Sequence, residues 1–184
     1  MRDEADSWVR PRGVGALGPM ADAARPRPAA ERRRDEVGQG EVVTGLVGAI
    51  VLPDGTAVRG RGRREPLPPG PLPEFGLYLG KPGKWEPEWS AEWIDWPDFR
   101  TPRDADGAAA AIVRAYEQAR AGRRVEVACG GGIGRTGTVI ACMGVLAGCP
   151  VDDVVAWTRH TYRRHAVETP GQRRWIRWFA AHQG

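Results

Sequence analysis

The chain has 184 residues, 41% of them hydrophobic and 27% charged, which is enough for one domain of ordinary size with its own core. Its formal net charge is +4, a mild basic balance carried almost wholly by arginine, and this gives no reason to expect a nucleic-acid partner. Three cysteines in a chain of this length exclude a disulfide scaffold and favour a reducing, cytoplasmic location.

The first forty residues differ in composition from the rest. Residues 1–40 are rich in Arg, Ala, Pro, Gly and acidic residues without any apolar period, so we predict that they are disordered. They show no signal peptide, Met20 is an alternative start of translation, and no later segment reads as a membrane span. We therefore expect a single folded domain over residues 41–184.

Strands are predicted in the first half of this domain. The stretch Gly45–Arg64 has an apolar run, a Pro-Asp-Gly turn and a second alternating run, which predicts a hairpin. Short strands follow over Phe75–Leu79 and near Ala91–Ile94. The arginines of residues 59–64 could bind the phosphates of RNA or lipid, but their place on a hairpin strand favours a solvent-exposed charged edge.

Helices are predicted in the second half: Asp104–Ala121, Arg135–Ala147, one that begins at Pro150, and one that begins at Pro170. Gly122 and Gly148 end the first two, and a brief strand over Val125–Ala128 separates them. Trp175, Trp178 and Phe179 of the last helix are expected to face inward. The alternation predicts an α/β fold with helices covering a central sheet.

The stretch EVACGGGIGRTG (residues 126–137) joins a predicted strand to a predicted helix and allows three readings. Gly132, Gly134 and Gly137 match a dinucleotide-binding GxGxxG, but that motif needs a second parallel strand, and residues 149–164 read as a helix. A Walker A loop fails at both diagnostic positions, which Cys129 and Arg135 occupy. Neither nucleotide reading is therefore favoured.

The third reading assigns a role to every special residue of the loop. The backbone N–H groups that follow the cysteine can form a cup for a tetrahedral dianion at a helix N-terminus; they belong to Gly130, Gly131, Gly132, Ile133, Gly134 and Arg135. Arg135 adds a bidentate fork for phosphate oxygens, and its charge favours a thiolate at Cys129 that can attack phosphorus. Thr136 can donate to the sulfur and improve it as a leaving group. The plainer alternative is that Cys129 is a small buried core residue.

The segment Cys129–Gly137 resembles the CxxGxGRTG loop of the cysteine-dependent protein tyrosine phosphatases, which include the dual-specificity enzymes. The resemblance implies a general acid on an upstream Trp-Pro-Asp loop, and residues 96–98 supply it with Asp98 as the acid. It also implies a Gln-Thr-x-x-Gln loop downstream, which residues 168–172 match except for a leading Glu; Gln172 would place the hydrolytic water. Thr169 and Gln172 also fit a helix capping box. The order of these elements excludes the low-molecular-weight phosphatases.

The resemblance implies a three-layer α/β fold of the protein tyrosine phosphatase type, in which a mixed central sheet with the cysteine strand at its centre is flanked by helices. It implies a metal-independent hydrolase without a cofactor that acts on phosphotyrosine in proteins, with phosphoserine and phosphothreonine as further substrates. The three histidines have no metal-ligand spacing, in agreement with this.

One departure from the family keeps other functions open. Ala128 stands where the family usually has His, which predicts a higher pKa of Cys129 than in relatives and slower turnover. The alternatives are a pseudophosphatase that binds phosphoproteins, and a phosphoinositide or RNA 5′-phosphatase on the same fold. A rhodanese-like sulfurtransferase would leave Asp98 without a role. Cys142 could form a disulfide with Cys129 under oxidation, but a core thiol is the simpler interpretation.

Overall fold

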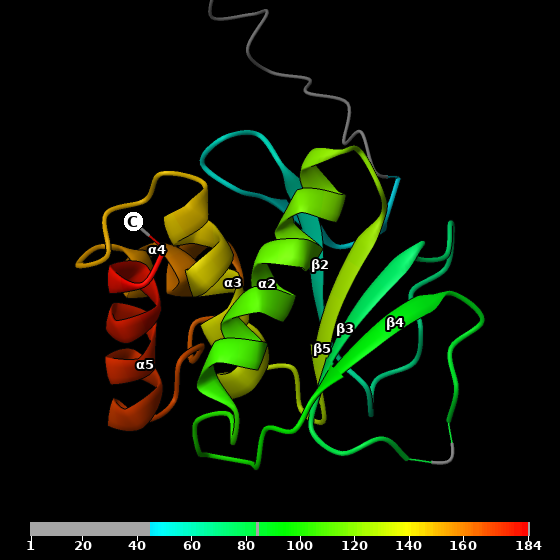
Figure 1. Cartoon of the computed structure of the whole chain (residues 1–184). Coiled ribbons are helices and arrows are strands. Elements are labelled where there is room, and N and C mark those ends of the chain that lie inside the picture. Colours follow the sequence, from blue (N-terminus) through cyan, green and yellow to red (C-terminus); the bar gives the residue numbers. More distant parts are fainter. Residues whose placement is uncertain (1–44, 84, 184) are drawn as a thin grey trace, which may run out of the picture. The chain divides into compact units, whose positions relative to one another are not determined.

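A computed structural model describes residues 45–83 and 85–183 of the chain (Figure 1). The chain divides into Met1–Gln39 and Gly40–Gly184, and every described residue lies in the second unit. The predicted disorder of residues 1–40 falls outside the described residues and stays a prediction. No helix in the described part is long and apolar enough to cross a lipid bilayer.

Five strands form one mixed sheet: β1 (Ala49–Val51), β2 (Ala57–Gly62), β3 (Phe75–Leu79), β4 (Ser90–Ile94) and β5 (Val125–Cys129). Their order across the sheet is β1-β2-β5-β3-β4. β1 pairs antiparallel with β2, which confirms the predicted hairpin, and all other pairs are parallel. The strand that ends at the cysteine therefore lies at the centre of the sheet, as predicted.

Four helices are described: α2 (Ala105–Arg120), α3 (Gly134–Leu146), α4 (Val154–Thr161) and α5 (Pro170–Ala181). Asp104 caps α2 by accepting the N–H of Gly107, and Gly148 after α3 has the positive φ of 95° that favours glycine at a helix end. The predicted start of α4 at Pro150 is wrong. Residues 150–153 form a turn, because the N–H of Asp153 bonds back to the Pro150 carbonyl three residues earlier, and the helix begins at Val154.

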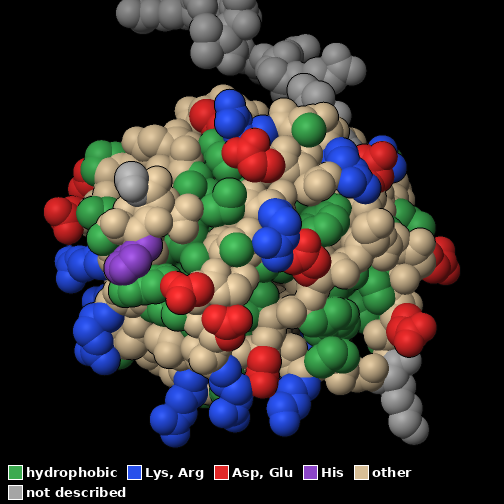
Figure 2. All heavy atoms as spheres, in the orientation of Figure 1, with side chains coloured by type: hydrophobic (Ala, Val, Ile, Leu, Met, Phe, Trp, Pro, Cys, Tyr) green, Lys and Arg blue, Asp and Glu red, His purple; other side chains and the backbone are tan. Residues whose placement is uncertain are grey.

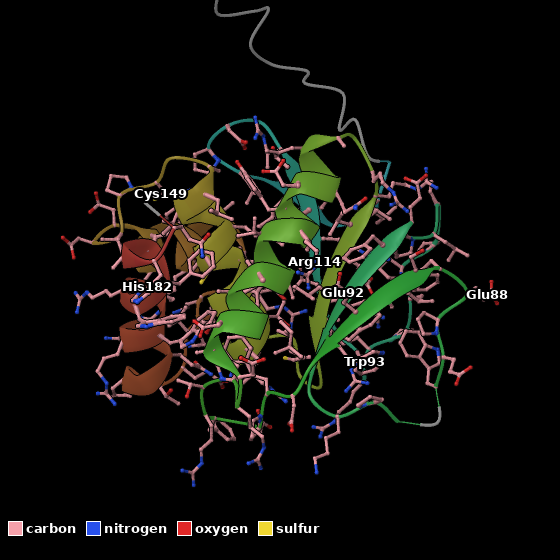
Figure 3. All side chains as sticks on the ribbon, viewed as in Figure 1. Glu88, Glu92, Trp93, Arg114, Cys149 and His182 are labelled. Atoms are coloured by element: carbon pink, nitrogen blue, oxygen red, sulfur yellow. The ribbon has the colours of Figure 1, made fainter. Side chains whose placement is uncertain are left out.

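The helices lie together on one face of the sheet (Figure 1). α2 and α3 contact both the strands and each other, and α4 and α5 pack on α3. Arg114 of α2 and Glu92 of β4 point toward each other and join helix to sheet edge through two hydrogen bonds of 3.1 and 2.8 Å (Figure 3). The core fills this space with Val58, Leu77, Leu79, Val125, Val127, Ile112, Ala115, Val139, Ile176 and Phe179. The predicted α/β class with a mixed central sheet is confirmed.

Among the described residues no helix covers the opposite face of the sheet. The layer on this face is therefore not helical, unlike the expected one. Loops and aromatic side chains cover it. The Tyr78 ring lies 5.2 Å from the Trp85 ring and 5.1 Å from the Trp93 ring, and the Trp89 indole N–H donates to the Tyr78 hydroxyl. These rings supply the apolar cover that a helix would otherwise give.

A charged network is buried under this aromatic layer. Glu126 of β5 is fully buried and accepts bonds from Arg59 and Arg61 of β2 at 2.9 to 3.1 Å. The Tyr78 hydroxyl donates to the same carboxylate at 3.3 Å. The prediction that the arginine run forms a solvent-exposed edge is therefore wrong for Arg59 and Arg61. β2 lies between β1 and β5 inside the sheet, and its alternation turns both guanidinium groups onto the buried carboxylate.

Candidate active site

The central strand and α3 position the cysteine loop. β5 ends at Cys129 and α3 begins at Gly134, so the loop between them lies at the carboxyl edge of the parallel strands. Gly132 has a φ of 69°, and a Cβ built on it would lie 2.4 Å from the backbone nitrogen of Gly62. Only glycine allows the loop to pack this closely against the end of β2.

Cys129 lies at the base of this loop with 2% of its surface exposed. The N–H of Gly132 donates to its Sγ at 3.1 Å, and its own N–H donates to the Thr136 hydroxyl at 2.9 Å. Burial raises the pKa of the thiol, but hydrogen bonds from Thr136 and Gly132 and the charge of Arg135 outweigh burial and hold the pKa below its ordinary value. The loop thus favours the thiolate, as the sequence predicted.

Arg135, in the first turn of α3, joins the loop to the segment that follows β4. Its Nη1 donates to the carbonyl oxygens of Trp96 at 2.9 Å and Leu79 at 3.3 Å. Its Nη2 lies 3.0 Å from a carboxylate oxygen of Asp98. Its Nε is buried without a hydrogen-bond partner in the described structure. Donors therefore remain for an anion held in the loop.

Residues 95–103, which we call the acid loop, bring Asp98 to this arginine. The buried Trp96 anchors the loop: its indole N–H donates to the Arg100 carbonyl at 2.6 Å, and its ring lies 5.0 Å from that of Trp175 on α5. The Arg103 N–H donates to the Asp95 carbonyl at 3.0 Å and closes the loop at its base. Asp98 itself is 55% exposed, so its carboxylate faces both the loop and solvent.

Gln172 combines a structural contact with a free donor. Its Oε1 accepts the N–H of Thr169 at 3.2 Å while the Thr169 hydroxyl accepts the N–H of Gln172, and this confirms the predicted capping box of α5. Its Nε2 is buried with no hydrogen-bond partner in the described structure. The same Nε2 lies 3.1 Å from the point where a Cβ on Gly134 would stand, so it reaches the cysteine loop.

The structure thus brings the predicted residues together from three separate segments: Asp98 from the acid loop, Cys129 to Thr136 from the cysteine loop and α3, and Gln172 from α5. Ala128, the position at which the resemblance implies His, pairs with Arg61 and Tyr78 in the sheet and so lies on the face of the Glu126 network. The slower turnover expected from this replacement stays a prediction.

The sequence analysis missed Tyr162, the residue that follows α4, whose hydroxyl donates to the Gly132 carbonyl at 2.5 Å and so holds the cysteine loop. No sequence pattern marks this contact, because it joins residues on separate elements. It also missed Arg63 and Arg64, which continue from β2 against the cysteine loop. Both belong to the arginine-rich run of residues 59–64, which the sequence analysis interpreted as a solvent-exposed edge.

Cys129, Cys142 and Cys149 are all free, and Cys142 is fully buried in the core among apolar side chains. Burial raises the pKa of the Cys142 thiol well above its ordinary value, which makes it a poor thiol for exchange. The described residues contain no cluster of three or more metal-ligating side chains.

Residues 93–180 match the family model PTP-SAK, described as the Swiss Army Knife protein, DSP-PTPase phosphatase domain. Among solved structures, the crystal structure of Tk-PTP in the active form is similar to 59% of this chain and 79% of its own, with 21% identity and a TM-score of 0.53. A mutant form of Tk-PTP covers 60% of this chain and 79% of its own at 19% identity, with a TM-score of 0.54. No curated protein matches the chain. At these identities the two structures support a phosphatase fold.

Proposed function

We propose that this chain hydrolyses phosphate monoesters through a cysteinyl-phosphate intermediate. The premise is that it belongs to the cysteine-dependent phosphatases of the dual-specificity-like type. One observation carries the proposal. The Sγ of Cys129 accepts the N–H of Gly132 in its own loop, and Arg135 in the first turn of α3 lies 3.0 Å from Asp98. The residues to which we assign the roles of nucleophile, anion-binding fork and acid are thus close to one another, which supports the proposal.

In the first proposed step the Cys129 thiolate attacks phosphorus. The S–P bond forms as the bond from phosphorus to the ester oxygen breaks, and Asp98 gives its proton to that oxygen. Arg135 and the loop N–H groups bind the three equatorial oxygens and stabilise their charge in the transition state. A phosphate dianion carries more negative charge than the Asp98 carboxylate, so the phosphate displaces this carboxylate from Arg135. Asp98 is then free to act as the general acid.

In the second step water attacks the cysteinyl-phosphate. Asp98 takes a proton from this water, the S–P bond breaks, and the sulfur leaves as the thiolate with inorganic phosphate as the product. Thr136 stabilises the departing sulfur, and the unpartnered Nε2 of Gln172 beside the loop binds the attacking water. These steps use only side chains of the chain and water.

The substrate that we propose is phosphotyrosine in proteins, with phosphoserine and phosphothreonine as further substrates that the family type permits. A cytoplasmic location agrees with the three free cysteines, since a reducing compartment keeps the nucleophile as a thiol. The competing function is a module that binds phosphoproteins without turnover, and the exposed carboxylate of Asp98 argues against it because binding alone needs no acid.

The test is phosphate release from an aryl phosphate and a phosphotyrosine peptide, with EDTA and a reductant present. We expect release by the natural chain, complete loss in Cys129→Ser, and a loss of about 10²–10⁴-fold in Asp98→Asn when the leaving group is poor. Asp106→Asn is the matched control, because Asp106 lies in the first turn of α2 and makes no contact with the cysteine loop among the described residues.

Two outcomes would count against the proposal. A folded natural chain that binds the peptide and releases no phosphate would establish a phosphoprotein reader. Release that survives Cys129→Ser would place the chemistry on another group.

A further inference from the structure

Two arginines continue from β2 directly against the cysteine loop. The N–H of Arg63 donates to the Cys129 carbonyl at 2.7 Å, and the N–H of Arg64 donates to the Gly130 carbonyl at 3.2 Å. These bonds extend the pairing of β2 with β5 beyond the end of the sheet. The backbone of both arginines is thus fixed relative to the phosphate cup.

Their guanidinium groups flank the cup beside Arg135. Arg64 Cζ and Nε lie 3.8 Å from the point where a Cβ on Gly130 would stand, and Arg135 Nη2 lies 3.6 Å from the same point. Around the corresponding point on Gly80, Arg135 Nη1 lies at 3.2 Å and Arg63 Nη2 at 3.7 Å. Because neither glycine carries a side chain, the space between each pair of guanidinium groups stays open.

The charges of Arg63 and Arg64 are not neutralised within the described structure. Neither side chain forms an ion pair there, and the buried Nε of Arg63 has no hydrogen-bond partner. Two acids near the cysteine loop pair with other arginines, Glu65 with Arg163 at 2.9 Å and Asp98 with Arg135 at 3.0 Å. The guanidinium of Arg63 instead lies over the ring of Trp93, 4.7 Å from its centroid, and this contact holds the guanidinium in place.

The guanidinium groups of Arg63, Arg64 and Arg135 thus surround one small anion site. Arg135 alone is sufficient to bind a single phosphate there. Burial and, second, the charge of Arg135 lower the pKa of Arg63, so these like charges oppose each other. Lys and Arg side chains gather along the edge of the molecule that is lowest in Figure 2, the end at which β5 meets α3 in Figure 1. Excess positive charge beside an anion site favours a ligand with more than one negative group.

We propose that Arg63 and Arg64 bind a second phosphate of the substrate, adjacent to the phosphate that Cys129 attacks. The ligand class is a polyol with phosphates on neighbouring carbon atoms, either free or as the headgroup of a lipid. An acidic residue of a phosphotyrosine peptide is a poorer ligand for Arg63 and Arg64. The length of the tyrosine side chain keeps the peptide backbone away from the phosphate, whereas these two guanidinium groups lie next to Gly80 and Gly130, close to the phosphate site. The inference rests on the proposed phosphatase chemistry and adds a second substrate class to the phosphotyrosine proposed above.

The test compares kcat/KM for inositol with two vicinal phosphates and for inositol monophosphate, with an aryl phosphate and a phosphotyrosine peptide as reference substrates. The bisphosphate is presented free and as the headgroup of phosphatidylinositol bisphosphate in phosphatidylcholine vesicles. The variants are Arg64→Ala and Arg63→Gln. The control is Arg174→Ala, which removes one exposed arginine of α5 that has no ion pair among the described residues.

We expect the natural chain to prefer the bisphosphate over the monophosphate by about tenfold or more, as charge-assisted hydrogen bonds predict. Either variant should lower this ratio by about tenfold, and Arg174→Ala should preserve it. A preference seen with the free compound assigns a soluble substrate, and one seen only in vesicles assigns the lipid. Equal kcat/KM for the two inositol phosphates, or a ratio unchanged in Arg64→Ala, would overturn the inference.

Failure of the proposed function is distinguishable from failure of this inference. If no substrate releases phosphate, binding of pyrophosphate and of orthophosphate by calorimetry still tests the second site. The second site is supported if the natural chain binds pyrophosphate more tightly than orthophosphate and Arg64→Ala binds the two anions equally. Equal binding of the two anions contradicts it.

Discussion

At Cys129 two opposing effects act on one thiol. Burial favours the neutral form, while the Thr136 and Gly132 hydrogen bonds and the Arg135 charge favour the thiolate and prevail. Since the thiolate is the deprotonated form, a lowered pKa means that the reactive species is present above that pKa and is lost as the pH falls through it. The side chain of Thr136 is the contribution that a single substitution can remove.

Thr136→Ala should therefore raise the pKa of Cys129 and slow its alkylation at neutral pH. The measurement is the rate of reaction with iodoacetamide as a function of pH, with the alkylated residue identified by mass spectrometry. Thr158→Ala is the matched control, because Thr158 is equally buried and its hydroxyl bonds to the Val154 carbonyl within α4. An unchanged midpoint in Thr136→Ala would mean that the backbone N–H of Gly132 and Arg135 suffice.

At the scale of elements, the cysteine loop depends on a contact between β2, α3 and Tyr162, the residue that follows α4. A Cβ on Gly60 of β2 would lie 2.5 Å from the Tyr162 ring and 2.6 Å from Ile140. Tyr162 is also the residue whose hydroxyl holds the Gly132 carbonyl. A change in β2 should therefore reach the phosphate cup through Tyr162.

Gly60→Ala should lower the free energy of unfolding by about 1–3 kcal/mol, as overpacking does, and weaken the binding of inorganic phosphate. Urea denaturation and calorimetry measure the two effects. Gly83→Ala is the control, since nothing lies within 4 Å of a Cβ on Gly83. Full phosphate affinity in Gly60→Ala would show that Tyr162 does not position the loop.

The capping box ties the stability of α5 to the site through Gln172. Thr169→Ala removes the acceptor for the N–H of Gln172 and should lower the free energy of unfolding by about 1 kcal/mol. Thr169→Ser keeps the hydroxyl and should restore most of it. Thermal and urea unfolding measure both variants, and equal stability of the Ala and Ser variants would contradict the role of the cap.

The elements with local signals were predictable, and those that depend on distant partners were not. The hairpin, the cap of α5 and the helix stop at Gly148 follow from patterns within a few residues. Cys129, Arg135 and Asp98 could be predicted as site residues because their motifs are short and ordered, and their catalytic roles stay predictions. The contact of Asp98 with Arg135 and the burial of Arg59 could not be read this way, since Arg59 is 67 residues from its partner Glu126.

At the scale of the whole molecule, Glu126 joins the central strand to both neighbours. Its carboxylate binds Arg59 and Arg61 from β2 and the Tyr78 hydroxyl from β3, and all four side chains are buried. Removal of one member of such a network leaves the others charged and buried, which costs more than the network itself contributes. The face without helices therefore depends on this one carboxylate.

Glu126→Gln keeps the size of the side chain but leaves two buried guanidinium groups without a counter-charge, so the free energy of unfolding should fall by about 3–5 kcal/mol. Glu92→Gln is the matched control, because Glu92 also pairs with an arginine, Arg114, but at the surface, where such a pair contributes about 0–1 kcal/mol. Urea unfolding followed by tryptophan fluorescence compares the two variants, and the signal reports on the aromatic layer over Glu126. Equal losses in both would mean that water enters between β2 and β5, and that the network does not hold the sheet.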